Sequence, residues 1–390
     1  MTRALLVDPN FSSVPIGQAL AQHGIDVATV GRKTSEGPYR NHFDIDYSDR
    51  AAMRALLQRE RFDYLIPGCT DKSYESCSAL AADWGFPALD SPEIFNQLYS
   101  KSKFRALCHQ LAICVPRVFT SEQEALQSNV PVIIKPDDAH SGIGITRLDL
   151  PTSTSLSRAV KVAQDFSSSG RVVIEEYVHG QLHSYSAFLQ DRRVHCAFHV
   201  AEYGTLNPFA VDTSYVLPTS SHELELENCA EKIAHALGLD CGLLHIQYLA
   251  KNSDICLIEA TRRCPGDLYA MLVTRSTGFP YAAAFGAPFI AQPISKIESP
   301  KFHRYLIRHT VSRKTFNLMG RNILEMGAAV EAWVPIANDL GEGVPDASRA
   351  GILFLRAADQ ADVMNVIATI YDGGCALKQR IENRPSREES

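Results

Sequence analysis

The segment 244–268, LHIQYLAKNSDICLIEATRRCPGDL, constrains the fold of this chain more than any other stretch. Two apolar runs flank a short polar stretch, a pattern typical of a β-hairpin. The second run carries one acid, Glu259, and is followed by Arg262 and Arg263. The segment therefore predicts two buried strands that bring an acid, two arginines and several polar groups together.

The length and charge of the chain limit the possible classes of protein. At 390 residues, the chain is long enough for two or three domains. A composition of 45% hydrophobic and 21% charged residues is typical of folded proteins. The net charge of -6 provides no general attraction to nucleic acid or anionic membranes. No stretch approaches the roughly 20 apolar residues of a membrane span, so we expect a cytoplasmic protein without nucleic-acid or membrane partners.

The ten cysteines are scattered and never form a Cys-x-x-Cys pair. This spacing indicates neither a zinc cluster nor a small disulfide scaffold. We expect most of them to be reduced and buried as small hydrophobic side chains.

Residues 1–90 alternate short apolar runs with helical patterns, as an open parallel sheet does. No Gly-x-Gly-x-x-Gly follows the first run, so a Rossmann-like shape here need not bind a dinucleotide. Ser91 and Pro92 then start a helical stretch that ends near Ile113. Lys101 and Arg105 share one face of this helix, either as a solvated basic face or as part of a site.

The apolar strand 130–135, VPVIIK, ends in Lys135 and is followed by DDAHSGIGI. Ser141, Gly142 and Gly144 allow the backbone to approach a polyphosphate closely, although a plain hairpin turn has the same composition. This loop is not a Walker motif, because no Gly-Lys-Ser/Thr ends it. A lysine at the end of a buried strand favours the anion site, since an unpaired buried ammonium is costly.

The segment 172–180, VVIEEYVHG, places two acids between apolar residues. Glu175 and Glu176 fit either a connecting segment that meets a ligand or a sheet edge with solvated carboxylates. His183, one of several histidines that follow, is expected to be structural rather than a metal ligand.

In order, these elements resemble the ATP-grasp superfamily, in particular its carboxylate-amine ligases. The similarity covers residues 3–375 by element order, and the specific motifs occupy residues 99–268. It implies an α/β and α+β fold, with a Rossmann-like N-terminal domain followed by a two-subdomain ATP-grasp fold and a small C-terminal sheet. The expected parts are an N-terminal domain (1–90), linking helices (91–115), a lid subdomain (116–180), a large subdomain (181–300), a C-terminal α+β portion (301–380) and a disordered tail (381–390).

The resemblance also implies the binding of ATP and Mg²⁺ by particular residues. Arg263 and Lys135 match catalytic positions, Arg263 as the residue that steadies the transferred phosphate. The implied metal ligands are Glu259, Thr261 and Gln247. The implied nucleotide contacts are Lys101 and Lys135 at the phosphates, Ser141, Gly142 and Gly144 in the phosphate lid, and Glu175 with the backbones of Glu176 and Val178 at the adenine edge.

Two positions depart from the family pattern. Leu182 stands where the family usually has a ribose-binding glutamate, and the neighbouring His183 is a candidate nucleotide contact without being its equivalent. Gln247 stands where an upstream metal-binding glutamate is common. Glutamine can offer a carbonyl oxygen to Mg²⁺ but removes one negative charge, which puts a second metal ion in doubt.

Whether the hairpin loop has an odd or an even number of residues tests the metal site. With a four-residue loop, 251–254, Gln247 would oppose Ile258 and point away from Glu259, because side chains alternate faces along a strand. We therefore predict an odd loop, such as the five residues 250–254, which would put Gln247 and Glu259 on one face.

The resemblance implies an ATP-dependent ligase that activates a small carboxylate as an acyl phosphate and joins it to an amine, possibly an amino acid. Two alternatives remain: a catalytically impaired ATP-binding regulator or scaffold, and phosphoryl transfer to a different acceptor. We expect substrates to contact the strand end at Cys69, Thr70 and Asp71 and the face that includes Arg262, with Asp71 equally able to cap a helix. A homodimer is compatible with the resemblance.

Overall fold

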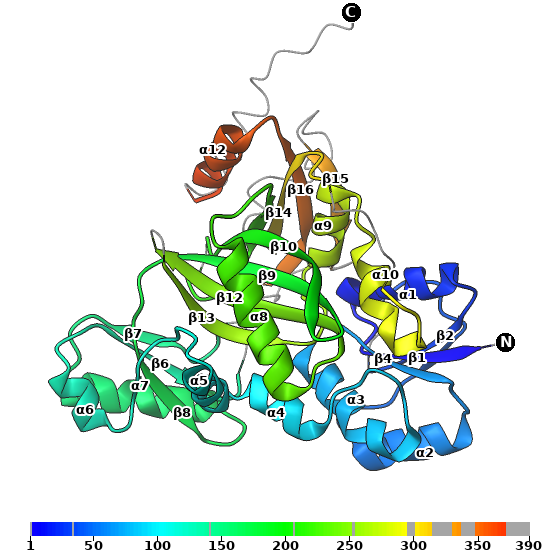
Figure 1. Cartoon of the computed structure of the whole chain (residues 1–390), viewed down its shortest axis with the longest axis horizontal. Coiled ribbons are helices and arrows are strands. Elements are labelled where there is room, and N and C mark those ends of the chain that lie inside the picture. Colours follow the sequence, from blue (N-terminus) through cyan, green and yellow to red (C-terminus); the bar gives the residue numbers. More distant parts are fainter. Residues whose placement is uncertain are drawn as a thin grey trace, which may run out of the picture.

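The structure is a computed structural model of the chain (Figure 1). It describes residues 2–32, 35–139, 142–205, 207–251, 254–294, 301–313, 330–336 and 348–371. Within these ranges the strands form two four-stranded sheets and one eight-stranded sheet. The predicted tail, 381–390, lies outside the described residues.

The N-terminal sheet is parallel, as the alternation of strands and helices predicted. Its order is β3-β2-β1-β4, and short apolar strands such as β1 are almost completely buried. Helix α1 joins β1 to β2 and α2 joins β3 to β4, and helices pack on the sheet, which gives the open α/β arrangement in blue in Figure 1. The elements are β1 (Arg3–Val7), α1 (Val14–Gln22), β2 (Asp26–Val30), β3 (Asn41–Phe43), α2 (Arg50–Arg59), β4 (Tyr64–Pro67) and α3 (Asp71–Trp84).

Two helices connect this domain to the rest, in the region 91–115 where linking helices were expected. Helix α4 (Pro92–Tyr99) ends before Ser100, and α5 (Lys101–Gln110) begins after it. Ser100 is extended, and its hydroxyl accepts a hydrogen bond from the Lys103 N–H as the N-cap of α5. The boundary between them was not predicted; it lies at Ser100 because a serine that caps a new helix also interrupts the preceding one.

The second sheet, at the lower left of Figure 1, lies within residues 116–180, which we call the lid subdomain after the expectation from the resemblance. Its strands are antiparallel in the order β5-β8-β6-β7, and α7 packs on β6. The elements are β5 (Val118–Phe119), α6 (Glu122–Gln127), β6 (Val132–Pro136), β7 (Thr146–Leu148), α7 (Ser153–Phe166) and β8 (Val172–Glu176).

The third sheet is the centre of the molecule, with the order β13-β12-β9-β10-β11-β14-β16-β15. The C-terminal strands extend this sheet and do not form the separate small sheet that we expected. Antiparallel pairing of β14 with β11 explains the difference, because it leaves no free edge between the two parts. The strands are β9 (Gln181–Gln190), β10 (Arg193–Tyr203), β11 (Thr213–Leu217), β12 (Cys241–Lys251), β13 (Asp254–Thr261), β14 (Tyr305–Ser312), β15 (Val330–Pro335) and β16 (Arg349–Ala357).

Helices cover both faces of the large sheet. Helix α8 (Glu223–Leu237) shares one apolar core with β9, β12 and β13. On the other face, α9 (Tyr269–Thr277) and α10 (Tyr281–Gly286) share a core with the N-terminal domain. Helix α12 (Gln360–Tyr371) covers the C-terminal strands on the face opposite α9, since Leu353 and Leu355 pack with α12 whereas Ile352 and Phe354 pack in the core with α9. No helix in the described ranges combines the length and apolar composition that a membrane crossing requires.

Candidate functional site

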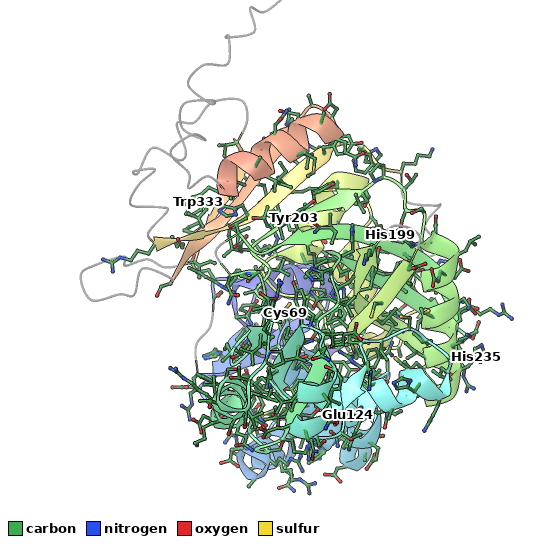
Figure 2. All side chains as sticks on the ribbon, turned by 90° about the vertical axis from the view of Figure 1, so that its left-hand side faces the viewer. Cys69, Glu124, His199, Tyr203, His235 and Trp333 are labelled. Atoms are coloured by element: carbon green, nitrogen blue, oxygen red, sulfur yellow. The ribbon has the colours of Figure 1, made fainter. Side chains whose placement is uncertain are left out.

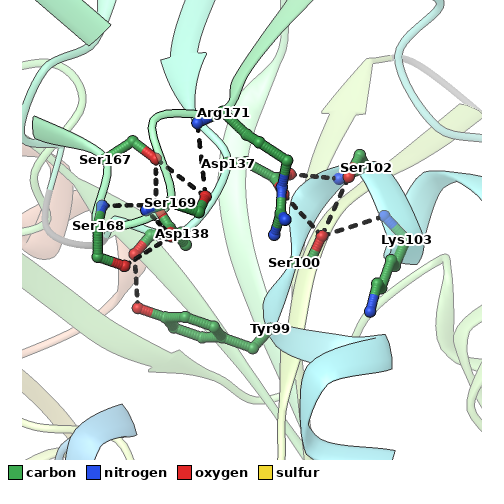
Figure 3. Close-up of polar contacts among 10 residues, drawn as sticks. All are labelled: Tyr99, Ser100, Ser102, Lys103, Asp137, Asp138, Ser167, Ser168, Ser169 and Arg171. Carbon is green, nitrogen blue, oxygen red and sulfur yellow. Dashed lines mark hydrogen bonds and ion pairs between the residues drawn. The ribbon is translucent and has the colours of Figure 1, made fainter. Parts of the chain in front are cut away.

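The start of α5 is bound to the residues that follow β6 through the polar contacts drawn in Figure 3. This arrangement brings the predicted site lysines Lys101 and Lys135 near each other. The Asp137 carboxylate is fully buried and accepts hydrogen bonds from the Ser100 hydroxyl at 2.8 Å and the Ser102 N–H at 2.8 Å. The Arg171 guanidinium lies 3.2 Å from the same carboxylate. These contacts fix α5 against the strand that ends in Lys135 and the loop that follows.

Lys101 is a buried cation beside the predicted phosphate loop. Its side chain is 8% exposed, and its Nζ donates to the Ala139 carbonyl at 2.7 Å. Within the part of the chain that the structure describes, it forms no ion pair with a carboxylate. Burial lowers the pKa of Lys101, and the nearby Lys135 acts in the same direction. A buried ammonium whose hydrogen-bond partner is a carbonyl is well suited to meet an anion.

Lys135 and Arg105 share one buried carboxylate. Lys135 Nζ lies 2.8 Å and Arg105 Nε 2.7 Å from the Glu175 carboxylate, whose side chain is fully buried. Although burial alone would raise the pKa of Glu175, the two cations hold it below its usual range. Two positive charges around one negative charge leave a net positive site, which favours an additional anion.

The adenine assignment of Glu175 is corrected by these contacts. Its side chain is enclosed by Lys135 and Arg105, so it positions cations and does not present a free carboxylate to a ligand. The Glu176 N–H donates to the Arg117 carbonyl at 2.9 Å, so any adenine contact of Glu176 would come from its carbonyl or side chain. The adenine contact of Val178, which is half-buried after β8, stays a prediction.

The glycines of the predicted phosphate loop adopt the left-handed conformation. Gly142 has φ +71 and Gly144 has φ +72, which L side chains rarely adopt. A Cβ on Gly142 would lie 2.5 Å from the Phe209 carbonyl oxygen, so a larger residue would also clash. Ser141 lies outside the described residues.

The hairpin contains the extra residue that we had placed in its loop. Lys251 pairs with Asp254, so the odd-loop prediction is wrong. The register then shifts after the pair Tyr248 and Leu257, leaving Ile258 as a β-bulge and Gln247 opposite Glu259. The extra residue of a bulge shifts the alternation of side chains by one position, as an odd-numbered loop would. The side chains of Gln247 and Glu259 therefore lie on one face of the sheet. Arg105 also donates to the Ile258 carbonyl at 2.6 Å, which ties the bulge to the Glu175 cluster.

A second buried glutamate, Glu202 on β10, belongs to this site and was missed from the sequence. Gln247 Nε2 donates to Glu202 Oε2 at 2.6 Å. Burial raises the pKa of Glu202 to about 7, against the lowering effect of the Ser184 hydroxyl and Arg308. The signal was a single acid in an apolar strand, HVAEY, the same signal that identified Glu259.

Glu259 lies among charges from three parts of the chain. Its charge acts on the pKa values of Lys101, Glu202 and Arg263. No hydrogen bond or ion pair satisfies its half-buried carboxylate within the described ranges. The structure thus places a carboxylate that is free to bind a cation beside the buried lysine.

Arg263 joins this site to the N-terminal domain. Its Nε and one terminal nitrogen donate to the two oxygens of Asp71 at 2.7 and 3.0 Å, and the Thr261 hydroxyl donates to the same carboxylate at 3.4 Å. Asp71 is therefore an interdomain partner, and Thr70 is the helix cap. The phosphate contact of Arg263 stays a prediction.

Arg262 has a different role from the one expected. It is 6% exposed, and its guanidinium donates to Asp90 and to the carbonyls of Leu243 and Cys241. The expected substrate contact is wrong, because consecutive residues of the chain point to different sides and Arg262 points into the interior.

His183 lies on the opposite face of the large sheet from the candidate site. Its neighbour Ser184 pairs with Gln247, whereas His183 pairs with Tyr248 and stacks on its ring at 5.4 Å. Burial, followed by the effect of His222, lowers the pKa of His183 to about 4. The predicted nucleotide contact of His183 is therefore wrong, and the expectation that it is structural agrees with its packing.

His199 (Figure 2) packs beside His183 and gives a testable pH dependence. Burial, with His183 and His222, lowers the pKa of His199 from 6.5 to about 4. Between these two pKa values, His199 binds a proton in the unfolded chain but not in the folded chain. The free energy of unfolding therefore falls as the pH falls. We measure the free energy of unfolding by urea titration at pH about 7.5 and about 4.5. We expect it to fall by about 2 kcal/mol less in His199→Phe than in the wild type. Parallel losses in the two proteins would contradict this account.

A cavity of about 350 Å³ lies elsewhere, at the start of β14 and the end of β16. Its lining includes Arg304, Tyr305 and Arg356 and none of the predicted site residues. The candidate site is therefore identified by the charged side chains that meet there, and not by this cavity.

Comparison with known proteins agrees with this arrangement. The family model described as ATP-grasp domain matches residues 128–270, which include Lys135, the glycine loop and the hairpin. The chain contains an ATP-grasp domain. Its match begins in the lid subdomain and ends in α9, so the charged cluster around Glu175 and Glu259 lies within or against it.

One curated relative and two solved structures extend the comparison beyond the ATP-grasp domain. The formate-dependent phosphoribosylglycinamide formyltransferase of Hahella chejuensis is 24% identical over 284 residues, covering 67% of this chain and 68% of the relative. The L-amino acid ligase of Bacillus licheniformis has a TM-score of 0.77 at 13% identity, covering 96% of this chain and 98% of that one. N5-carboxyaminoimidazole synthetase of Staphylococcus aureus, complexed with ADP, has a TM-score of 0.77 at 11% identity, covering 95% and 97%. These structures share the fold over nearly the whole chain.

Proposed function

We propose that this protein is an ATP-dependent ligase that activates a small-molecule carboxylate as an acyl phosphate and joins it to an amine. The observation that carries the proposal is the convergence of Lys101, Lys135 and Glu259 on one site. The ATP-grasp domain and its similarity to a formyltransferase and an amino acid ligase support the same class of chemistry. A cytoplasmic location and a homodimer stay predictions from the sequence.

The proposed reaction brings several anions together, which explains the need for buried cations. A carboxylate oxygen attacks the γ-phosphorus of ATP, and the bond to the β-phosphate oxygen breaks to release ADP. The amine nitrogen then attacks the acyl carbon, the carbon–oxygen bond to phosphate breaks, and the nitrogen loses a proton. Lys101 and Lys135 would balance the phosphate charge, and the glycine loop would exclude water from the acyl phosphate.

The residues present fit a magnesium ion. Mg²⁺ prefers oxygen ligands and is commonly held by one or two carboxylates together with substrate phosphates. Glu259 offers a carboxylate, and Gln247 keeps its carbonyl oxygen while its nitrogen binds Glu202. When bound, Mg²⁺ would neutralise phosphate charge. In the described residues no group of three or more His, Cys, Asp or Glu side chains could hold a metal alone, which agrees with a site completed by the nucleotide.

Gln247→Glu tests this metal site without measuring turnover. The change would place a third carboxylate beside Glu202 and Glu259, and in the absence of Mg²⁺ we expect a loss of about 1–3 kcal/mol of stability. Mg²⁺ with ADP should raise the Tm of the variant more than that of the wild type, because the added charge has a partner. Equal Tm shifts would contradict the assignment of Gln247 and Glu259 to one cation site.

A release assay with pooled substrates tests the proposed function. ADP release is measured with pools of small carboxylic acids and amines, separately and together, and active pools are divided until single compounds remain. We expect release to require both pools, and the product mass to equal acid plus amine minus water. ADP release with tight ATP binding but without dependence on either pool would overturn the proposal.

Leu182 and Gln247 favour a second candidate, an ATP-binding regulator with impaired catalysis. Leu182 lies on the same face of the sheet as Gln247. It is two residues from Ser184 on β9, so the two side chains share a face, and Ser184 pairs with Gln247. Mg-ATP binding without ADP release over the complete substrate panel would support this candidate. A reaction product that contains no amide would instead indicate phosphoryl transfer to a different acceptor.

A further inference from the structure

The linker that leads into the lid subdomain contacts the site hairpin through a cysteine. Residues 111–117 connect α5 to β5, and the Leu257 N–H on β13 donates to the Cys114 carbonyl at 2.9 Å. This bond places the linker alongside β13, next to Cys256. Cys114 is exposed, whereas Cys256 is 7% exposed.

The Cys114 and Cys256 side chains are near enough to interact, because Cys114 adds to the effect of burial in raising the pKa of the Cys256 thiol. Both are free thiols, although the linker and the strand are more than a hundred residues apart in sequence. We propose that Cys114 and Cys256 are a modification site, which forms a reversible disulfide that tethers the lid linker to β13. The inference does not depend on the proposed ligase reaction.

Thiol–disulfide exchange with a small disulfide such as oxidised glutathione supplies the chemistry. The exposed Cys114 thiolate attacks one glutathione sulfur, and the first reduced glutathione leaves. The Cys256 thiolate then attacks the Cys114 sulfur, which forms the internal disulfide and releases the second glutathione. Two electrons and two protons pass to glutathione. Burial, with Cys114, raises the pKa of the Cys256 thiol to about 12, so the second step should be the slow one.

The position of Cys256 connects oxidation to the candidate site. Cys256 lies within electrostatic range of Arg105 and Glu175, the cluster that holds Lys135 and the bulge at Ile258. A covalent tether at this point fixes the segment through which the lid is attached. We therefore expect oxidation to restrain the lid linker while leaving the N-terminal domain unchanged.

The chain provides an internal control in a second pair of neighbouring cysteines. Cys69, followed by burial, raises the pKa of the Cys264 thiol, and the two residues are 4% and 0% exposed. Cys69 lies in the interior of the molecule (Figure 2). Because neither thiol is accessible to an oxidant, this pair should remain reduced while Cys114 and Cys256 react.

Peptide mapping of the full-length chain tests the proposal. The protein is incubated with oxidised glutathione, remaining thiols are alkylated, and the digest is analysed by mass spectrometry. We expect a cross-linked peptide pair joining Cys114 to Cys256, two hydrogens lighter than the sum of the free peptides, with Cys69 and Cys264 alkylated. A lasting glutathione adduct on Cys114 alone, or a preferred cross-link between Cys69 and Cys264, would overturn the proposal.

Hydrogen exchange tests the tether itself. We expect amides of the linker 111–119 to exchange about tenfold more slowly in the oxidised protein and to recover with dithiothreitol. Cys114→Ser and Cys256→Ser should each abolish the change, while Cys196→Ser, a matched control on β10, should retain it. Equal exchange rates in the oxidised and reduced proteins would show that no tether forms.

Discussion

Glu259→Gln is expected to reduce ADP release by about 100- to 1,000-fold, because it removes the carboxylate charge at the centre of the site. The substitution preserves side-chain size, and no ion pair within the described chain depends on Glu259, so the fold should be retained. The measurement is steady-state ADP release with the active acid and amine pools, together with the Tm of the variant.

Asp254→Asn is the matched control for Glu259→Gln. Asp254 begins the same strand, β13, but is exposed at the turn end of the hairpin. We expect the control to release ADP at a rate close to that of the wild type. Similar rates for the Glu259 variant and the control would remove Glu259 from the reaction.

Arg105→Met is expected to lower the free energy of unfolding by about 3–5 kcal/mol, since removing one partner of a buried ion pair leaves an uncompensated charge. Arg105 is 1% exposed and binds both Glu175 and the Ile258 carbonyl. The loss therefore affects the lid strand β8 and the bulge together. Urea unfolding followed by circular dichroism measures it as a lower midpoint.

An exposed pair of the same type provides the control for Arg105. Arg117 lies 2.9 Å from Glu124, but their side chains are 58% and 33% exposed, so Arg117→Met should cost only about 0–1 kcal/mol. Arg105→Lys should be intermediate, because it keeps the charge but cannot bind both partners in the same geometry. If the Met variants at the two positions lose equal stability, the buried cluster does not have the role assigned here.

Local sequence patterns predicted most of the elements because they follow from apolar periodicity and end signals. The strand that ends in Lys135 occurs close to its expected position, as β6. The boundary between the two linking helices was not predicted, because it depends on the cap geometry of Ser100. His183 was misplaced because adjacency along a strand means opposite faces in the sheet.

The partners of buried charges were not predictable from local patterns. Glu175 meets Arg105 and Lys135 from two other elements, and Arg263 meets Asp71 from a different domain. Each pairing depends on how the sheets and helices pack. Burial then decides which charge needs a partner, because the cost of an unpaired charge appears only when water is excluded.

By itself, the sequence determined which residues are candidates for the chemistry: two lysines in order, a glycine loop, and an acid on a buried hairpin. Only the tertiary structure decided how Glu259 comes to face Gln247. For Glu259 and Gln247 to share a face of the sheet, the hairpin needs one extra residue between them. Either a longer loop or a bulge can supply that residue. The bulge at Ile258 occurs where Arg105 from a distant helix binds its carbonyl, a contact that exists only in the folded chain.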